Sequence, residues 1–505
     1  MRAAWEKLKT TDWKSPTVIC FAFVMLLSYF TYFHNYWNPP ALFWDENYHI
    51  ASAQKYLNGV YFMEPHPPLA KLFIAAGEWL LHPNAATDQF IGTDYGTALP
   101  ANFSFAGYRF FPTLFAWLIA PLFFCIFLLL TRNSSLSLFL SILYIFDNAL
   151  IVHSRSAMLD STLHFFVMAS VFLFLLLIRS KDNTKKFRTY ALLFGLIFGA
   201  IVTTKANGLA MLLLVPALLW KLRSSLQRIP EFCVLMLVGF MAVYAGVWYI
   251  HFALGSTVNH SLPDNGYYQA SESYKEILDE GGNRSILNFS LMLKEHLAFL
   301  PHYEKGVPKL DLCKPAENGS PWFLWPVGAR TINYRWWTPG NPPVYSYLYM
   351  VPNPVGWFFG LAGVLLAVCL LLGSVFLPLQ EKLQYRFELT TFLLIYLGYM
   401  AAVSRIDRVM YLYHYFIPLM MSFLLFGLAV MEIKRFLGWR ITMQTKTAIV
   451  TLCGLLIFGG YQFMRPLTYY EPISDEAFEK RDLLKIWDMK CVRCEKDSVL
   501  MEKSC

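Results

Sequence analysis

Charged residues are scarce in this chain of 505 residues: 15% are Asp, Glu, Lys or Arg, whereas 56% are hydrophobic. Soluble globular proteins have about 25% charged residues. The mean hydropathy of +0.41 agrees with this deficit. An ordinary soluble domain is therefore excluded, and we expect a protein embedded in a bilayer. The sequence also lacks an internal repeat, which disfavours a secondary transporter built from repeated halves.

Two further absences narrow the function. No basic run is interleaved with aromatic residues, so we expect no nucleic-acid partner, and the formal net charge of +8 is better explained by basic cytoplasmic loops. The histidines show no H-x-x-x-H spacing, so we predict no metal and no other cofactor.

Cysteine is neither clustered nor paired along most of the chain. Five of the nine cysteines lie inside apolar runs, where we expect inert packing residues: Cys20, Cys125, Cys233, Cys369 and Cys453. The C-terminal tail holds Cys491, Cys494 and Cys505. A metal knuckle there lacks a second ligand pair, so we expect a disulfide in an oxidising compartment.

Long apolar runs are what the sequence has in abundance. A bilayer core of roughly 30 Å needs about 20 apolar residues per helix. This length predicts about eleven transmembrane helices, near residues 17–37, 109–131, 136–153, 161–179, 190–204, 207–221, 231–254, 355–379, 387–403, 409–430 and 447–464. The fold class we expect is an all-α, multi-pass membrane protein.

Lys and Arg concentrate in alternate loops, which sets the expected orientation. Basic residues gather before the first span and after the fourth, sixth, eighth and tenth. Short cytoplasmic loops are enriched in such residues. We therefore expect a cytoplasmic N-terminus, an external C-terminus and a plasma (inner) membrane location. No small-residue cleavage site adjoins the first apolar run, so we expect this helix to be retained.

Two long loops fall on the expected external side, at residues 38–108 and 255–354. Both are rich in Trp and Tyr, which favours folding against the membrane surface. We expect one transmembrane catalytic domain over residues 1–470 and an external tail over residues 471–505.

The first external loop begins with an unusual polar stretch, Ala41–Lys71, which contains the adjacent acids Asp45 and Glu46. Adjacent side chains do not face each other on a helix or a strand. One carboxylate acting as a base, with its neighbour shaping the site, is therefore more plausible than an acid/base pair. The alternative is that both acids only begin a helix, where negative charge is favoured.

Further charges lie at the external ends of expected spans, where burial is costly. Arg155 with Asp160 could form a loop ion pair. The long side chain of Lys205 could extend so that its ammonium reaches the membrane interface. The stretch 404–415 places Arg405, Arg408 and His414 on the same face as Asp45. Cations near a carboxylate suit a substrate with a phosphate leaving group. These features favour an enzyme with a lipid-linked donor; a transporter is the rival class.

An ordered set of motifs resembles the protein O-mannosyltransferase family. The set covers residues 40–470: DENYHIASAQKYLNGVYFMEPHPPLAK (45–71), GYRFFP (107–112), DNALIVHSRSAMLDSTLHFF (147–166), Lys205–Gly208, YIHFALGS (249–256), SPWFLWPVGARTINY (320–334), VPNPVGW (351–357) and YLYHYFIP (411–418). The resemblance implies the GT-C glycosyltransferase fold. It also implies transfer of mannose from a polyprenyl-phosphate carrier to Ser or Thr of secreted or membrane proteins.

The resemblance implies roles for individual residues. Asp45 would be the catalytic base, Glu46 its neighbour in the acidic motif, and Arg155 the arginine of the stretch that ends in Leu-Asp-Ser. The loop 255–354 is too short for the β-trefoil domain of eukaryotic members, which indicates a bacterial-type member. A GT-C enzyme that moves another lipid-linked sugar to lipid A or a wall polymer is an alternative, and a dimer is possible.

The chemistry of these residues predicts a single displacement with inversion. Asp45 would take the proton of the acceptor hydroxyl, although Glu46 could hold this role instead. Arg155, Arg405 and Arg408 would bind the carrier phosphate, because guanidinium pairs phosphate through two hydrogen bonds. We expect His66, Lys71 and His414 to bind phosphate or acceptor, although helix capping and interfacial contact are equally open for His66 and Lys71.

Overall fold

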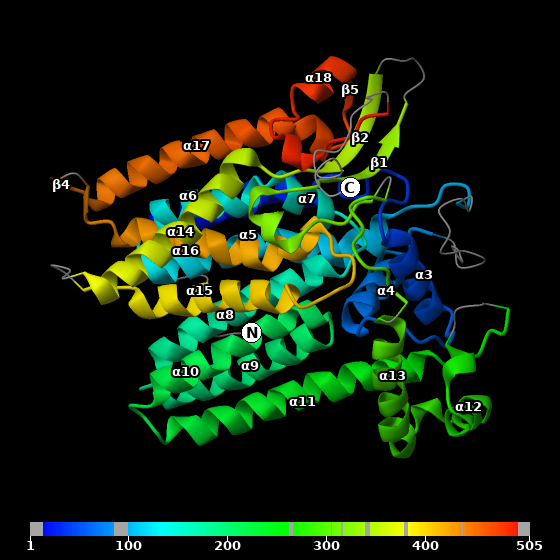
Figure 1. Ribbon diagram of the computed structural model, residues 1–505. Coiled ribbons are helices and arrows are strands. Elements are labelled where there is room, and N and C mark those ends of the chain that lie inside the picture. Colours follow the sequence, from blue (N-terminus) through cyan, green and yellow to red (C-terminus); the bar gives the residue numbers. More distant parts are fainter. Residues whose placement is uncertain are drawn as a thin grey trace.

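The computed structural model describes residues 14–84, 99–261, 266–304, 306–314, 317–338, 344–377, 382–436 and 438–492. Its helices run side by side in a bundle, and shorter helices with a small sheet gather at one end (Figure 1). The bundle consists of α2 (Pro16–Ser28), α5 (Ala106–Thr131), α6 (Ser134–Ile145), α7 (Asn148–Ser154), α8 (Asp160–Ser180), α9 (Thr184–Val202), α10 (Leu214–Leu222), α11 (Arg228–Leu254), α14 (Pro354–Phe376), α15 (Arg386–Val403), α16 (Phe416–Glu432) and α17 (Met443–Thr468).

Helices occupy all eleven expected span positions. Eight described helices are by themselves long and apolar enough to cross a membrane, or nine if α6 and α7, bent by 63°, count as one span. The remaining two positions hold α9 and the shorter apolar segment Ala206–Leu222. The first turns of α9 carry Lys185, Lys186 and Arg188, so this helix is less apolar than its neighbours.

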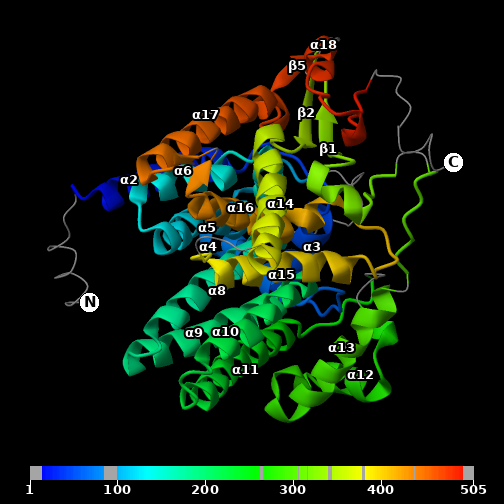
Figure 2. The same cartoon turned by 60° about the vertical axis from the view of Figure 1, so that its left-hand side comes forward.

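The centre of the bundle is α16. Every residue from Phe416 to Ala429 is buried, as expected for a helix that is apolar on all sides. It packs against α14, α15 and α5, and Figure 2 shows α14 passing across it. A buried central helix leaves the polar residues before Phe416 fixed at the end of the bundle.

The break between α6 and α7 is built from buried polar side chains. The carboxylate of Asp147 accepts hydrogen bonds from the backbone N–H of Leu150 and from Nε1 of Trp357, both at 2.8 Å. The amide of Asn353, at the start of α14, donates to the carbonyl of Phe146 at 2.8 Å. Because these groups are paired, the break in the backbone between α6 and α7 is held in one place.

The two loops expected to be external form the end of the bundle that carries the sheet. The first loop contains α3 (Glu46–Leu57) and α4 (Leu69–Leu81), and the second contains α12 (Glu272–Asp279), α13 (Phe289–Glu304), β1 (Ile332–Trp337) and β2 (Val344–Met350). β1 and β2 are antiparallel, with Ile332 opposite Met350. β5 (Pro472–Ser474) adds antiparallel to β2 and precedes α18 (Asp475–Glu479). The start of the C-terminal tail therefore packs on the second loop.

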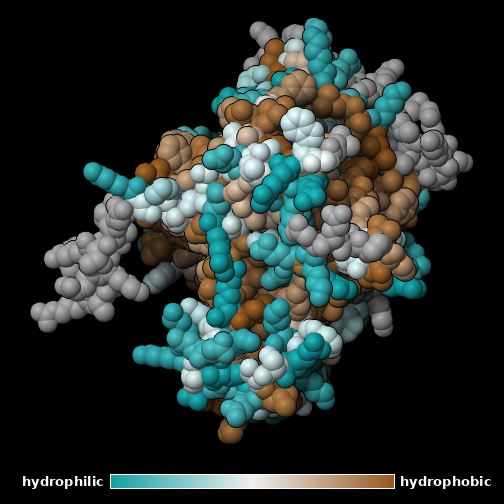
Figure 3. All heavy atoms as spheres, turned by 90° about the vertical axis from the view of Figure 1, so that its left-hand side faces the viewer, coloured by the Kyte–Doolittle hydropathy of each residue, from teal (hydrophilic) through white to brown (hydrophobic). Residues whose placement is uncertain are grey.

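Hydrophilic side chains gather at the opposite end of the bundle, between apolar flanks (Figure 3). The loops α8–α9, α10–α11, α14–α15 and α16–α17 lie there (Figure 1), the last with the hairpin β3 (Arg435–Phe436) and β4 (Trp439–Arg440). Four of the five expected basic segments thus share one end. Most of the fifth, with Arg2, Lys7 and Lys9, lies outside the described residues.

Candidate active site

Glu46 is wholly buried in an ion pair between the first external loop and α5. Nε and Nη2 of Arg109 donate to its two carboxylate oxygens, each at 2.7 Å, and neither side chain is exposed. The backbone N–H of Ala157 donates to the same carboxylate at 2.8 Å. Arg109 also donates to three carbonyl groups at 2.7–2.8 Å, those of Trp37, Pro39 and Ala41. Glu46 therefore ties together three chain segments.

Asp45 immediately precedes this pair but has a different environment. Its side chain is partly exposed and makes no capping hydrogen bond at the start of α3. Within the described part of the chain, no other group forms a hydrogen bond or an ion pair with its carboxylate. Burial raises the pKa of Asp45 to about 6, while the charge of Lys205 lowers it and that of Asp160 raises it. Such a carboxylate is mostly ionised at neutral pH and can accept a proton.

A cation whose charge acts on Asp45 is Lys205, which follows α9. Its ammonium donates to both oxygens of Asp160, at 2.9 and 3.1 Å. Nε2 of His153 lies 3.2 Å from Asp160, and the ring of Tyr413 lies 5.5 Å from the ammonium. An ammonium has three N–H donors, and only Asp160 accepts from it among the described residues. A donor therefore remains for a ligand.

Aromatic rings form one wall beside Asp45, with Trp44 at its centre. The φ of Trp44 is 51°, which places its ring against Tyr334 at a centroid distance of 5.0 Å and edge-on to Tyr411 at 5.3 Å. Tyr411 stacks on Tyr413 at 5.6 Å. Burial and the Asp45 carboxylate raise the pKa of Tyr411. This wall joins the first loop, the sheet and the segment before α16 into one site.

His414 belongs to this wall, and its ring is held by the backbone of Tyr411. Nδ1 of His414 lies 3.2 Å from the backbone N of Tyr411 and 3.0 Å from its carbonyl oxygen. The imidazole stacks on Tyr413 at 4.5 Å and on Trp325 at 6.2 Å. The structure thus places His414 next to the site, and its binding of phosphate or acceptor stays a prediction.

His66 and Lys71 lie in the same loop but have different roles. Burial, aided by Lys205 and Arg408, lowers the pKa of His66 to about 3, so its ring is neutral at pH 7. Lys71 is buried in an ion pair with Glu64. His66 is therefore near the charges around Asp45, whereas the charge of Lys71 is already neutralised.

The three arginines expected to bind phosphate are not brought together. Arg408 is partly exposed, and its charge acts on His66 and Tyr411, beside Asp45. Arg405 is exposed, and none of the described interactions connects it to that site. Arg155 is buried and donates to three carbonyls, at 3.2, 3.1 and 2.7 Å, of Thr31, His34 and Asn35. The phosphate-binding role of the three remains a prediction.

Sequence reasoning did not include Lys205, Asp160 and Arg109 among the site residues. The sequence leaves a loop ion pair open for Asp160 and an interfacial position open for Lys205. An ionisable residue inside an apolar segment usually faces the protein interior. If that rule is applied to Arg109, the arginine of GYRFFP, and to Lys205, it identifies both as candidate site residues.

No group of three or more His, Cys, Asp or Glu side chains in the described ranges could hold a metal ion. Cys491 is disulfide-bonded, and so is Cys313 in the second loop, which the sequence analysis did not consider. Cys494 and Cys505 lie outside the described residues. The five cysteines in apolar runs are free.

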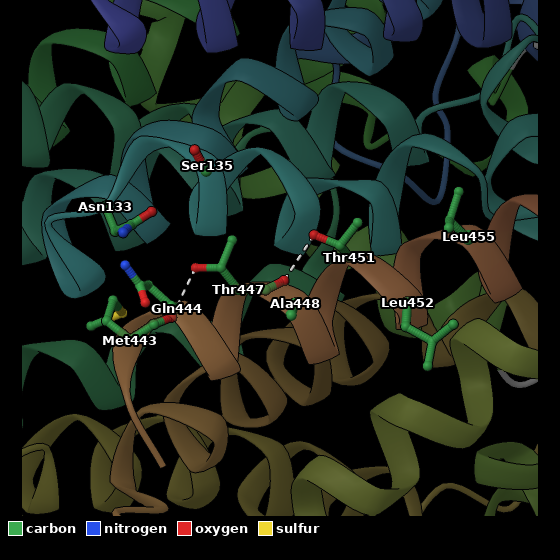
Figure 4. A pocket seen from close by; sticks show the side chains of 9 residues that line it. All are labelled: Asn133, Ser135, Met443, Gln444, Thr447, Ala448, Thr451, Leu452 and Leu455. Atoms are coloured by element: carbon green, nitrogen blue, oxygen red, sulfur yellow. Dashed lines mark hydrogen bonds between the residues drawn. The ribbon is translucent and has the colours of Figure 1, made fainter.

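Two hollows lie along α17. A cavity of about 410 Å³ lies near its end and is lined by Arg155, Arg465 and Glu471 among others. A groove of about 570 Å³ lies near its start and is lined by Thr447, Thr451 and Leu455 of α17 and by Asn133 and Ser135 (Figure 4). Neither hollow is lined by Asp45 or Lys205.

Comparison with known proteins finds one family. Residues 22–255 match the family model described as dolichyl-phosphate-mannose-protein mannosyltransferase. Residues 298–487 match the C-terminal four-helix transmembrane region of protein-O-mannosyltransferase. The chain is 30% identical to protein O-mannosyl-transferase 2 of Danio rerio over 277 residues, which are 50% of this chain and 34% of that protein. It is 30% identical to dolichyl-phosphate-mannose–protein mannosyltransferase 4 of Candida albicans over 188 residues, 37% of this chain and 24% of that protein. The chain thus spans about a third or less of the length of these relatives.

The solved structures agree on the fold. The Pmt1–Pmt2 complex of Saccharomyces cerevisiae, a protein O-mannosyltransferase bound to its sugar donor, matches with a TM-score of 0.79 at 16% identity over 97% of this chain and 95% of that chain. The apo oligosaccharyltransferase of Archaeoglobus fulgidus matches with a TM-score of 0.50 at 13% identity over 95% of this chain and 59% of that one. The expected GT-C fold is confirmed.

Proposed function

Because the chain belongs to the protein O-mannosyltransferase family, we propose that it transfers mannose from a polyprenyl-phosphate carrier to Ser or Thr hydroxyls of secreted or membrane proteins. The observation that carries this proposal is Asp45, a partly exposed carboxylate that no described residue pairs with and whose pKa is about 6. A hydroxyl is a weak nucleophile and needs a base within hydrogen-bond reach. Asp45 supplies that base beside the fixed charge of Lys205.

The reaction is a single displacement. The acceptor oxygen attacks the anomeric carbon of mannose while Asp45 takes the hydroxyl proton. The bond between that carbon and the phosphate oxygen breaks, and its electron pair leaves with the carrier phosphate. With one carboxylate available as base and no covalent intermediate, the anomeric configuration inverts.

The leaving phosphate needs cations that are already in place. Lys205 is held by Asp160 and keeps one N–H donor that no described residue accepts from, and the charge of Arg408 acts on His66. We assign these two side chains to the phosphate. His66, neutral at pH 7, contributes a ring N–H and no charge. Glu46 shapes the loop that carries Asp45.

The site faces the external side of the plasma (inner) membrane in our proposal, with the N-terminus inside. The grouping of basic loops at the end opposite the sheet supports this orientation. The disulfide-bonded Cys313 and Cys491 support an oxidising compartment at the sheet end. Reporter fusions at Lys186 and Arg435 should report the cytoplasm, and a fusion at Trp322 the exterior; a cytoplasmic Trp322 contradicts the assignment.

The Pmt1–Pmt2 structure is a complex of two chains, and we extend this to a dimer of the present chain. The mass of the purified protein in nanodiscs, measured by light scattering, tests this point. A monomeric mass with full activity contradicts it.

The activity itself is tested with purified protein in liposomes, polyprenyl-phosphate-[¹⁴C]mannose and candidate secreted acceptors. We expect label in alkali-labile protein linkages. Label in lipid alone favours a GT-C transferase that acts on lipid A or a wall polymer, and substrate flux without transfer favours a transporter. An Asp45→Asn protein serves as the control, because it keeps the shape of the site without its base.

A further inference from the structure

The cavity near the end of α17 contains a buried cation without an acidic partner. Arg155 is 6% exposed, and its hydrogen bonds go to three carbonyl groups. Its guanidinium lies 5.0 Å from the centroid of the Tyr469 ring. No described carboxylate forms an ion pair with it. A buried charge is stabilised best by a counter-charge. None of the described residues supplies such a counter-charge to the guanidinium of Arg155.

The rest of the cavity adds a second cation and one acid. Arg465 is 49% exposed at the rim and pairs with Glu471 at 2.9 Å. His34 and Tyr461 also line the space. Two guanidinium groups therefore face one carboxylate, and the surplus positive charge favours an anion. Guanidinium binds phosphate through paired hydrogen bonds.

The cavity opens among residues that face lipid. Phe30, which lines it, is 54% exposed on the N-terminal helical span. Along α17, the residues that line the groove in Figure 4 precede those that line the cavity. In the groove, Thr447 and Thr451 donate their hydroxyls to carbonyls one turn back, at 3.0 and 2.8 Å. The groove is thus suited to an apolar chain.

The dimensions agree with a lipid. Leu455 in the groove and Arg465 in the cavity are ten residues apart on α17, which is about 15 Å along a helix. Half of a bilayer core is also about 15 Å. An acyl chain that starts from a headgroup at Arg465 therefore reaches the groove within one leaflet.

We propose that this cavity binds the phosphate headgroup of an anionic membrane phospholipid, with an acyl chain along α17. The phosphate of the sugar carrier is a different ligand, because it leaves from the carbon that the acceptor attacks and so belongs beside Asp45. Asp45, Lys205 and Arg408 are not among the residues that line the cavity. The lipid site goes beyond the transferase activity and does not depend on it.

The test is lipid binding to the purified protein in detergent. Phosphatidylglycerol and phosphatidylcholine with the same acyl chains are titrated separately, and bound lipid is counted by native mass spectrometry. We expect one tightly retained phosphatidylglycerol and weaker retention of phosphatidylcholine. Equal retention of the two lipids overturns the proposal.

Two substitutions with opposite expected effects on phosphatidylglycerol binding locate the site. Arg465→Gln should weaken phosphatidylglycerol binding about tenfold, because a charge-assisted hydrogen bond is lost. Glu471→Gln should strengthen it, because a like charge is removed. Arg440→Gln removes an exposed arginine at the other end of the bundle and serves as the matched control. No change in either rim variant, or an equal change in the control, contradicts the site.

A competition experiment separates the two sources of phosphate. Polyprenyl phosphate is added to the complex with phosphatidylglycerol, and we expect both lipids to bind together. Displacement of phosphatidylglycerol by an equimolar amount of polyprenyl phosphate would mean that the cavity is the carrier site, and the proposal fails. Because no readout uses mannose transfer, failure here is distinct from failure of the proposed activity.

Discussion

Asp45 and Glu46 are adjacent in the chain, yet they belong to two different regions of the molecule. Four N–H groups point at the Glu46 carboxylate, from Arg109 (two), Ala157 and Phe43. No described group donates to Asp45. Adjacent residues at the start of a helix point in different directions. Glu46 therefore contacts α5, whereas the carboxylate of Asp45 is affected by the charge of Lys205. The fully paired carboxylate builds the frame, and the unpaired one keeps its capacity to accept a proton.

The cations of the two regions differ in the same way. Arg109 donates its N–H groups to Glu46 and to three carbonyls. Among the described residues, Lys205 donates only to Asp160. A buried ion pair that is fully hydrogen-bonded is costly to break but contributes no reactivity. The contrast separates residues that fix the structure of the site, such as Glu46 and Arg109, from residues proposed to contact the substrate, such as Asp45 and Lys205.

The largest effect should come from Asp45→Asn. The substitution preserves size but removes the base, which is worth roughly 10²–10⁴ in rate. We expect turnover to fall by that amount while the melting temperature and donor binding stay unchanged. Mannose transfer by the purified variant, with a thermal melt as the folding control, measures it. Near-normal turnover here, together with a folded but inactive Glu46→Gln, would reverse the assignment of the base.

Glu46→Gln should act on stability first. Removing one partner of a buried ion pair costs about 3–5 kcal/mol, because the guanidinium of Arg109 stays buried without its counter-charge. We expect a clearly lower melting temperature and a smaller loss of turnover per folded molecule than in Asp45→Asn. Glu46→Leu combined with Arg109→Met should recover part of the stability, since neither charge remains buried. An unchanged melt of Glu46→Gln contradicts the structural role.

The pH profile sharpens the comparison further. Asp45 must be ionised to accept a proton, and its pKa is raised to about 6. We expect kcat/KM to be level above that pH and to fall about tenfold per pH unit below it. Lys205 lowers this pKa, so Lys205→Met should move the acid limb to higher pH. Lys186→Met, an exposed lysine in a basic loop, is the control that should leave the limb in place.

The smallest effects distinguish two arginines. Arg408 acts on groups beside Asp45, so Arg408→Ala should raise the KM for the lipid donor about tenfold. Arg405 is exposed and lies outside the site, so Arg405→Ala should leave both constants unchanged. Steady-state kinetics with varied donor measure both. Equal effects of the two substitutions on the KM for the lipid donor would contradict the assignment of Arg408 alone to the site.

The sequence predicted the class of the fold because hydropathy is a local property. Runs of about 20 apolar residues predict spans without knowledge of neighbours, and helices occupy each expected position. Where the sequence was less accurate, the cause is also local: α9 begins with charged residues, and the span 136–153 breaks at Asp147, whose side chain caps a new helix. The acidic pair and the histidine of the first loop were also found from sequence, because charge in that setting is rare.

The sequence alone therefore determined a membrane-embedded helical enzyme with Asp45 as a candidate base. The tertiary structure decided which carboxylate is free. Glu46 is neutralised by an arginine 63 positions later, and Lys205 meets an aspartate 45 positions earlier. Such pairings depend on which helix faces pack together, and this packing depends on the whole chain. Hydropathy predicts that a charge in a span has a high free-energy cost. Only the packing of the helices determines which partner lowers that cost and which charged group stays available for reaction.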